Sequence, residues 1–238
     1  MDSVESALAA ERGGARRLEL CDALFDGGTT PSAGMIAACR HRASIPVFVI
    51  IRPRGGGFVY SAPELDVMRR DIEAARGLGA NGVVLGVLRR DGDIDEQQTR
   101  SLVDAAGDLP VTFHRAFDFA RDPGAAMETV ISAGITRILT SGGAPTARER
   151  VATLASLVRQ AGDRLVVMAG GGVREENVKA IVDGSGVREV HVRLTRLTRG
   201  DGLPLVPGLK VRKALPGDEA AWEETDEARI RNFVSAAG

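Results

Sequence analysis

Hydrophobic and polar positions follow two alternating patterns along this chain. Short apolar runs recur, among them VFVI at 47–50, VVL at 83–85 and LVVMA at 165–169. Between them lie longer segments whose apolar residues repeat at helical spacing, such as Leu65, Met68 and Ile72. Continuous apolar runs are typical of parallel strands buried on both faces, and the longer repeats are typical of amphipathic helices. The pattern therefore predicts a series of strand–helix units.

The units are counted from the same pattern. Strands are expected at 16–22, 47–53, 82–88, 111–117, 137–141, 165–169 and 189–194. Helices are expected at 2–13, 31–42, 63–78, 95–106, 123–133, 146–161, 174–183 and about 218–236. Pro31 stands in the first turn of its helix, where a missing N–H costs nothing. The number and order of elements favour an α/β fold of the TIM (β/α)₈ barrel type.

We expect one barrel domain over residues 1–238, because no linker or low-complexity stretch interrupts the pattern. A less regular segment is expected at 198–217, which contains Gly and Pro, before the C-terminal helix. The chain begins with a helix, whereas this fold begins with a strand. Strand 1 is therefore expected to be lacking in the chain as given. Either the recorded start lies downstream of the true one, or a gap separates the first and last strands.

Composition narrows the class of protein. The formal net charge of -1 argues against nucleic-acid binding, which needs a basic face. No apolar run approaches the roughly 18–20 residues that span a bilayer. The first residues, MDSVE, are acidic and do not resemble a signal peptide. We expect a cytoplasmic protein without membrane or nucleic-acid partners, assembled as a homodimer or a higher homo-oligomer, since two-fold assembly is the commonest.

Chemistry is expected at the carboxyl ends of the strands, where this fold places its active sites. Strand alternation gives these positions one inward-facing set: Glu19, Cys21, Arg52, Arg54, His114, His191 and Arg193. Glu19, His114 and His191 are candidate catalytic residues, because carboxylates and imidazoles exchange protons near neutral pH. Arg52, Arg54 and Arg193 are candidate anion ligands, because a guanidinium fork matches carboxylate and phosphate. For each residue taken singly, a structural role is the plainer alternative.

Two further features bear on the chemistry. Gly170, Gly171 and Gly172 follow the strand at 165–169 and offer backbone N–H groups to an anion, although a tight turn also explains glycine there. The three lysines, Lys179, Lys210 and Lys213, lie outside the strands, which argues against a Schiff-base aldolase.

Cys21 is the candidate metal ligand. Beside the two histidines it offers a soft donor of the kind that Cu(I) prefers, and a small buried hydrophobe is the alternative.

Seven segments, in this order, resemble the CutC family: 2–24 (DSVESALAAERGGARRLELCDAL), GGTTPS, IRPRGG, 111–118 (VTFHRAFD), LTSGG, VMAGGGV and EVHV. The resemblance covers residues 2 to about 194. It implies a (β/α)₈ barrel, a cytoplasmic homo-oligomer and a part in copper homeostasis, with Cu(I) bound by the cysteine of the ELC motif, Cys21. The family's second cysteine belongs to a strand before DSVES, which this sequence does not contain. Arg193 departs from the small residue usual after the histidine that matches His191.

Two functions stay open at this point. In the first, the protein takes part in the control of copper homeostasis by binding Cu(I) at the barrel mouth through Cys21. In the second, it is an enzyme of isomerase, lyase or hydrolase type that acts on a small anion such as a sugar phosphate or a carboxylate. Three arginines at the mouth favour the second, since cations repel a cation.

Overall fold

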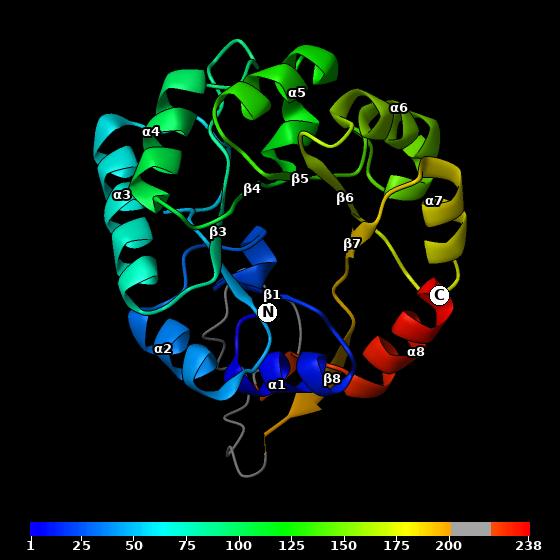
Figure 1. Ribbon diagram of the computed structural model, residues 1–238. Coiled ribbons are helices and arrows are strands. Elements are labelled where there is room, and N and C mark those ends of the chain that lie inside the picture. The colour runs from blue at the N-terminus through cyan, green and yellow to red at the C-terminus, as the bar shows by residue number, and fades with distance from the viewer. Residues whose placement is uncertain (201–219) are drawn as a thin grey trace, which may run out of the picture.

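A computed structural model describes residues 1–200 and 220–238 of the chain. Seven parallel strands form one sheet in chain order, and the sheet curls into a barrel wall (Figure 1). They are β1 (Leu18–Leu20), β2 (Val47–Ile50), β3 (Gly82–Leu85), β4 (Val111–Phe113), β5 (Arg137–Thr140), β6 (Val166–Gly170) and β7 (Glu189–His191). The predicted barrel class is thus confirmed, with seven strands in the parallel sheet of the described residues.

Helices connect the strands and lie outside the sheet (Figure 1). They are α1 (Val4–Arg12), α2 (Ala33–Arg42), α3 (Ala62–Gly77), α4 (Glu96–Ala106), α5 (Pro123–Ser132), α6 (Val151–Ala161) and α7 (Val178–Ser185). Their starts follow from the sequence. The Ser61 side chain accepts the Glu64 N–H while the Glu64 carboxylate accepts the Ser61 N–H, which is a capping box at the start of α3. None of the described helices is long and apolar enough to cross a membrane.

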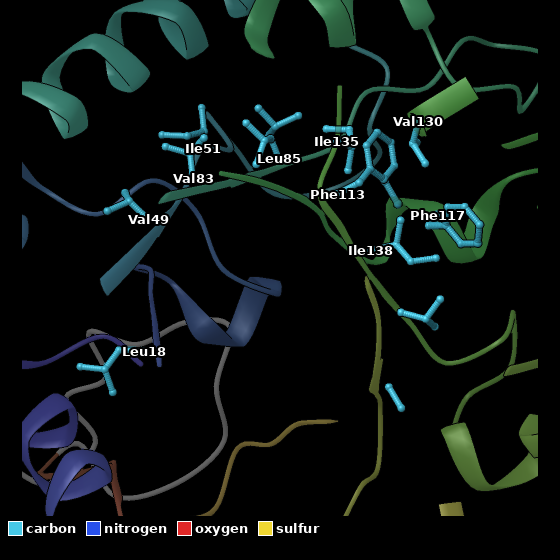
Figure 2. Packing of buried hydrophobic residues seen from close by; sticks show 14 of the residues in the cluster. Leu18, Val49, Ile51, Val83, Leu85, Phe113, Phe117, Val130, Ile135 and Ile138 are labelled. Atoms are coloured by element: carbon cyan, nitrogen blue, oxygen red, sulfur yellow. The ribbon is translucent and has the colours of Figure 1, made fainter. Parts of the chain in front are cut away.

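Apolar side chains pack in two separate clusters. The larger cluster lies between the sheet and the helices, and includes Leu18, Val49, Val83 and Ile138 (Figure 2). The smaller cluster lies on the opposite face of the strands and consists of Cys21, Phe48, Ile50 and Val84, with Leu24 against it. Strand alternation produces this division, because neighbouring residues such as Val83 and Val84 point to opposite faces. Polar residues therefore share the barrel interior with only a few apolar side chains.

The strands end earlier than the sequence predicts. The segment 111–117 stops being a strand at Phe113, and residues Arg115–Phe119 form the 3₁₀ helix η2. Its first turn is fixed by the His114 ring, whose Nδ1 accepts the Ala116 N–H at 3.2 Å. Alternation no longer applies beyond Phe113, and the Arg115 side chain reaches the loop after β5, where its Nη2 donates to the Ser141 hydroxyl.

The C-terminal region also differs from the prediction. The predicted helix at about 218–236 begins only at Glu227, as α8 (Glu227–Ala237), because β9 (Ala221–Thr225) pairs antiparallel with β8 (Thr195–Arg199). Residues 221–225 (AWEET) form a strand because they pair residue by residue with β8. The helix α8 is capped by Asp226, whose side chain accepts the Arg229 N–H. Most of the less regular segment predicted at 198–217 lies outside the described residues.

A gap separates β1 from β7, the two edges of the sheet in the described residues. Met1 lies beside β1: its N–H₃⁺ group donates to the Glu19 carbonyl at 2.9 Å, and its carbonyl accepts the Cys21 N–H at 2.9 Å. No strand pair joins β1 and β7 across this part of the described chain. Side chains from both edges meet there instead, and they are the first elements of the candidate site.

Candidate functional site

Two ion pairs link β1 and β7 across the gap. Glu19 Oε1 lies 3.2 Å from His191 Nε2. Two residues nearer the amino end of each strand, Arg17 Nη2 lies 2.6 Å from Glu189 Oε2. Spacing explains the pairing, because Arg17, just before β1, stands two residues from Glu19, as Glu189 stands two residues from His191 in β7. The side chains thus connect two strand edges that are not paired with each other in the sheet of the described residues.

The Arg17–Glu189 pair is part of a charge cluster that fills the amino end of the barrel interior. Arg137 Nε donates to the same Glu189 Oε2 at 2.7 Å, and both arginines lie over the ring of Phe48. Burial raises the pKa of Glu189, but the hydrogen bonds from Arg17 and Arg137 outweigh it and hold the pKa below its ordinary value. These ion pairs and ring contacts fill the amino end of the barrel interior, which is a structural role.

Glu19 is largely buried and stays ionised. Burial raises the pKa of its carboxyl, yet the charge and hydrogen bond of His191, the N-terminal ammonium group and His114 together lower it below 4.5. A buried carboxylate with a histidine at hydrogen-bond distance is a proton acceptor whose orientation is fixed. The structure therefore brings together two of the three predicted catalytic residues, Glu19 and His191, and the electrostatic influence of His114 reaches them.

His114 is buried, with 7% of its surface exposed. Burial lowers the pKa of its imidazole to about 4, against the opposing influence of Glu19. Because Nδ1 accepts the Ala116 N–H, the neutral ring carries its proton on Nε2, and that atom is buried without a hydrogen-bond partner among residues 1–200 and 220–238. Gly86 makes room for the ring, since a Cβ there would stand 2.6 Å from His114 Cε1. A buried donor with no partner is costly, which makes it a candidate ligand contact.

Arg52 is buried, but most of its donors are already used. Nη1 donates to the carbonyls of Asp26 and Gly28, and Nη2 donates to the carbonyl of Gly56. Its Nε atom is buried and has no hydrogen-bond partner within the described ranges. The guanidinium therefore ties the loop after β1 to the loop after β2, and keeps one free donor beside the ring of Phe58, whose centroid lies 5.2 Å from Cζ.

Arg54 and Arg193 lie on the surface, apart from the Glu19–His191 pair. Arg54 Nε donates to Glu64 Oε1 at 2.5 Å, and its Nη atoms donate to carbonyls of its own loop. Arg193 pairs with Glu223 of β9. Both residues follow the last residue of their strand, so alternation does not direct them inward. Their role as anion ligands stays a prediction, and each already has a carboxylate partner.

Cys21 closes the carboxyl end of β1, with 2% of its surface exposed. Burial raises the pKa of its thiol, although the N-terminal ammonium group acts in the opposite direction. Its Sγ atom lies 3.6 Å from the Met1 nitrogen and 3.5 Å from the Met1 carbonyl oxygen. The described residues contain no group of three His, Cys, Asp or Glu side chains placed to hold a metal ion.

The glycine turn after β6 is closely packed. A Cβ on Gly170 would stand 2.4 Å from Leu139 Cδ1, and one on Gly172 would stand 2.8 Å from Thr146 Cγ2. Gly171 and Gly172 have φ values of 94° and 64°, which favour glycine. Gly170 also lies beside His191, its register partner in β7. The turn therefore adjoins the acid–base pair at the mouth.

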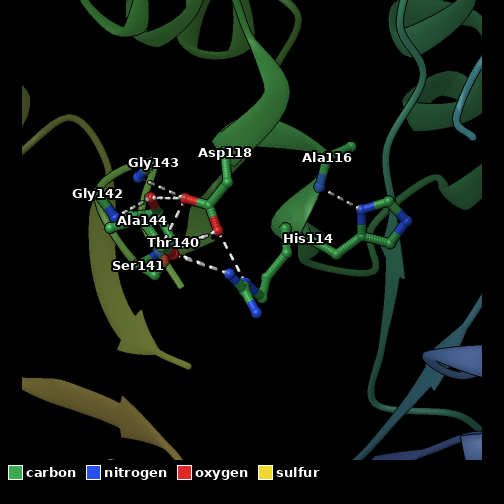
Figure 3. Close-up of polar contacts among 9 residues, drawn as sticks. His114, Ala116, Asp118, Thr140, Ser141, Gly142, Gly143 and Ala144 are labelled. Carbon is green, nitrogen blue, oxygen red and sulfur yellow. Dashed lines mark hydrogen bonds and ion pairs between the residues drawn. The ribbon is translucent and has the colours of Figure 1, made fainter. Parts of the chain in front are cut away.

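A polar network that the sequence did not single out holds the neighbouring loop (Figure 3). The Asp118 carboxylate accepts the Thr140 hydroxyl, the Ser141 N–H and hydroxyl, and the Gly143 N–H. Asp118 and His114 point away from each other on either side of η2 in this view. The motif HRAFD was visible in the sequence, but its aspartate gains a role only because η2 turns it toward the end of β5.

A cavity of about 450 Å³ opens beside these loops. Its lining residues are Asp26, Arg52, Gly56, Gly57, Phe58, Leu88 and Phe119. The Phe58 ring also packs against His114, with ring centroids 4.9 Å apart. A second cavity, of about 540 Å³, lies around the amino ends of β5, β6 and β7 and contains none of the predicted site residues. The cavity at the mouth is therefore the one relevant to the candidate site.

The fold and the site define a class of protein: a TIM-type α/β barrel with ionisable side chains and a cavity at the mouth of its strands. The chain belongs to the CutC family, whose sequence profile matches residues 1–195. This confirms the resemblance seen in the sequence.

Relatives and solved structures agree with this membership. The chain is 45% identical over 238 residues to the copper homeostasis protein cutC homolog of Mus musculus, with 100% of this chain and 87% of that protein covered. It is 48% identical over 240 residues to the family protein CutC of Chromobacterium violaceum, covering 98% and 94%. The CutC crystal structure from Streptococcus agalactiae matches with a TM-score of 0.76 and 37% identity, covering 80% of this chain and 94% of that one.

A more distant structure shows the fold alone. The phosphoribosylanthranilate isomerase of Thermotoga maritima matches with a TM-score of 0.56 at 16% identity, covering 100% of this chain and 94% of that one.

Proposed function

We propose that this protein takes part in copper homeostasis and that its barrel mouth is an acid–base catalytic centre for a small anionic substrate. The first statement is supported by the names of relatives at 45% identity over the whole chain. The second is supported by the geometry of Glu19, His191 and His114. Copper homeostasis is the proposed cellular role and acid–base catalysis the proposed chemistry, and a separate experiment tests each.

One observation carries the chemical proposal: an ionised Glu19 shares the barrel interior with a neutral His114, whose buried Nε2–H has no partner in the part of the chain that the structure describes. The carboxylate is placed to take a proton, and the neutral imidazole is placed to donate a hydrogen bond to an oxygen on which negative charge develops. A carboxylate base combined with a neutral histidine is an arrangement that suits proton abstraction next to a carbonyl group.

His191 completes the proposed centre. Its Nε2 lies 3.2 Å from the Glu19 carboxylate, so it orients that carboxylate toward the barrel interior. The apolar part of the substrate would occupy the cavity lined by Phe58 and Leu88, which adjoins His114 through the Phe58 ring. Arg52 lines the same cavity, and its Nε has no partner among the described residues.

The test is hydrogen–deuterium exchange of substrate C–H groups in D₂O, followed by NMR over a panel of small keto and hydroxyketo phosphates and carboxylates. We expect exchange with at least one compound for the wild type and for His41→Gln, which removes an exposed imidazole from α2. We expect its loss in Glu19→Gln. No exchange with any compound, or exchange that survives Glu19→Gln, would overturn the proposal.

Cu(I) binding at Cys21 is the second candidate, favoured by the names of the relatives. The residues present do not fit a Cu(I) site, because one thiol with a raised pKa supplies a single soft donor and the thiolate is the form that binds metal. A Cu(I) titration against a competing chelator, under reducing conditions, decides between the candidates. We expect weak binding that Cys21→Ser leaves unchanged, whereas tight one-to-one binding lost in Cys21→Ser would establish copper as the ligand.

A complementation assay tests which residues the cellular role in copper homeostasis depends on. In a copper-sensitive cell that lacks its own copy of the family, Cys21→Ser should restore copper tolerance and Glu19→Gln should not. The opposite pattern would assign the role to copper binding at the thiol.

We further propose that the protein acts in the cytoplasm as a homodimer or a higher homo-oligomer. Exposed Phe25 and Phe119 at the mouth and Leu197 and Trp222 on the β8–β9 hairpin offer apolar surface for assembly. Light scattering coupled to size exclusion tests the assembly, and a monomer across the concentration range would refute it.

A further inference from the structure

Arg115 lies between the loops that follow β5 and β6, and its guanidinium has one fixed orientation. Nε donates to Asp118 Oδ2 at 2.8 Å, and Nη2 donates to the Ser141 hydroxyl at 3.0 Å and to the Ala144 carbonyl at 3.4 Å. Asp118 is itself fixed, since its buried carboxylate accepts the donors of the loop after β5. Two of the three guanidinium nitrogens, Nε and Nη2, thus hold the protein's own loops together.

The third nitrogen, Nη1, is available among the described residues. Among residues 1–200 and 220–238, Arg115 Nη1 has no hydrogen-bond partner, and 42% of the side-chain surface is exposed. A rigid arginine with one free Nη group presents a charged donor at a fixed place, which is what a binding site for an anion requires.

The backbone of the glycine turn reaches the same guanidinium. A Cβ on Gly171 would stand 3.4 Å from Arg115 Cζ and 3.2 Å from Ser141 Cβ, so Gly171 leaves room for the guanidinium to lie beside the turn. Within the described part of the chain, the N–H groups of Gly171 and Gly172 donate no hydrogen bond to the protein. Two backbone N–H groups without a partner in the described residues therefore belong to the turn that packs against Arg115, and the left-handed backbone of this turn resembles that of anion-binding nests.

The position of this cluster relates it to the acid–base centre. Gly170 is the register partner of His191, and a Cβ on Gly170 would stand 3.3 Å from His191 Cβ. An anionic group beside Gly171 would consequently lie near the pair formed by Glu19 and His191. A substrate with its charge at one end and its reacting carbon at the other would reach both.

We propose that Arg115 Nη1 and the N–H groups of Gly171 and Gly172 bind the phosphate group of the substrate. The proposal rests on the function proposed above and names the class of substrate: a small phosphorylated carbonyl compound. Phosphate is favoured over carboxylate because the planar two-bond contact between arginine and carboxylate uses two neighbouring nitrogens, and two of the three are already taken by Asp118 and Ser141. Donors from three separate groups suit a tetrahedral oxyanion.

The experiment uses inorganic phosphate as the probe and measures saturable binding to the full chain by thermal shift and ³¹P NMR, at constant ionic strength kept with chloride. Each variant is compared with its own melting temperature without phosphate, so a loss of stability alone does not imitate a loss of binding. Arg115→Gln should bind phosphate roughly tenfold more weakly, because a charge-assisted hydrogen bond is lost.

Two variants sharpen the result. Gly171→Ala keeps the guanidinium but places a methyl group against it, and should also weaken phosphate binding. Arg69→Gln is the matched control, since Arg69 is an exposed arginine that pairs with an aspartate three residues away, as Arg115 does, and it should bind phosphate like the wild type. Equal phosphate binding by Arg115→Gln and Arg69→Gln, or no saturable binding by the wild type, would overturn the proposal.

The outcome is separable from that of the proposed function. Glu19→Gln should lose the C–H exchange and still bind phosphate. Phosphate binding that depends on Arg115, in a protein that exchanges no C–H group, would retain the phosphate site and refute the acid–base centre.

Discussion

The buried His114 should make the stability of this protein depend on pH in a defined window. In the unfolded chain its imidazole titrates near 6.5, whereas in the fold burial lowers the pKa to about 4. Between these two values the unfolded state binds more protons than the folded state, so stability falls as the pH falls. Above the window the imidazole is neutral in both the folded and the unfolded state, and below it the imidazole is charged in both. The contribution of His114 to stability therefore stops changing with pH on either side of the window.

The magnitude follows from the displacement of the pKa. A shift from 6.5 to about 4 corresponds to roughly 3 kcal/mol of unfolding free energy, lost at about 1.4 kcal/mol per pH unit through the window. The cause is the transfer of an imidazolium into the barrel, with only 7% of the residue exposed. The opposing carboxylate of Glu19, with a pKa below 4.5, titrates below most of this window.

The assay is urea unfolding of the wild type and of His114→Gln between about pH 5 and pH 7.5. Glutamine preserves a polar side chain of similar length and does not titrate, so the variant starts less stable and loses less on acidification. The unfolding free energy of the wild type exceeds that of His114→Gln, and this excess should shrink by about 2 kcal/mol from about pH 7 to about pH 5. His41→Gln is the control for removing an imidazole from an exposed helix. Parallel pH profiles for the wild type and His114→Gln would refute the assignment of a neutral, desolvated imidazole.

Three further predictions concern packing, the loop network and the thiols. Gly82→Ala should lower the unfolding free energy by about 1–3 kcal/mol, because its Cβ would stand 2.5 Å from the Phe48 ring inside the barrel, and urea titration with unchanged midpoint would contradict it. Asp118→Asn should cost about 2–4 kcal/mol, because an amide cannot accept every donor of the loop after β5, and amide exchange of that loop should accelerate. Cys21 and Cys39 should react with Ellman's reagent only after unfolding, because both are buried and burial raises the pKa of each thiol, and rapid labelling of the native protein would disprove this.

The sequence predicted the fold well because the fold depends on local patterns. The apolar runs and their glycine and proline boundaries give seven parallel strands and the helices between them, and the structure contains both. The exceptions have physical reasons. Residues 221–225 form a strand because they pair with 195–199, a contact that no local pattern announces. The end of 111–117 is a 3₁₀ turn because the His114 ring captures a backbone N–H two residues later.

The sequence alone determined the chemical inventory of the barrel mouth and the faces of the strands. In the structure Leu18 and Leu20 belong to the larger cluster, between sheet and helices, and Cys21 to the smaller cluster on the opposite face, as alternation along a strand requires. Only the tertiary structure decided which side chains at the mouth have a hydrogen-bond or ion-pair partner. Arg54 and Arg193 have carboxylate partners from other segments, whereas the Nε2–H of His114 and Arg115 Nη1 have none in the described chain. Pairing between charges depends on distances across the fold, and these distances arise only when the sheet curls and brings its ends together.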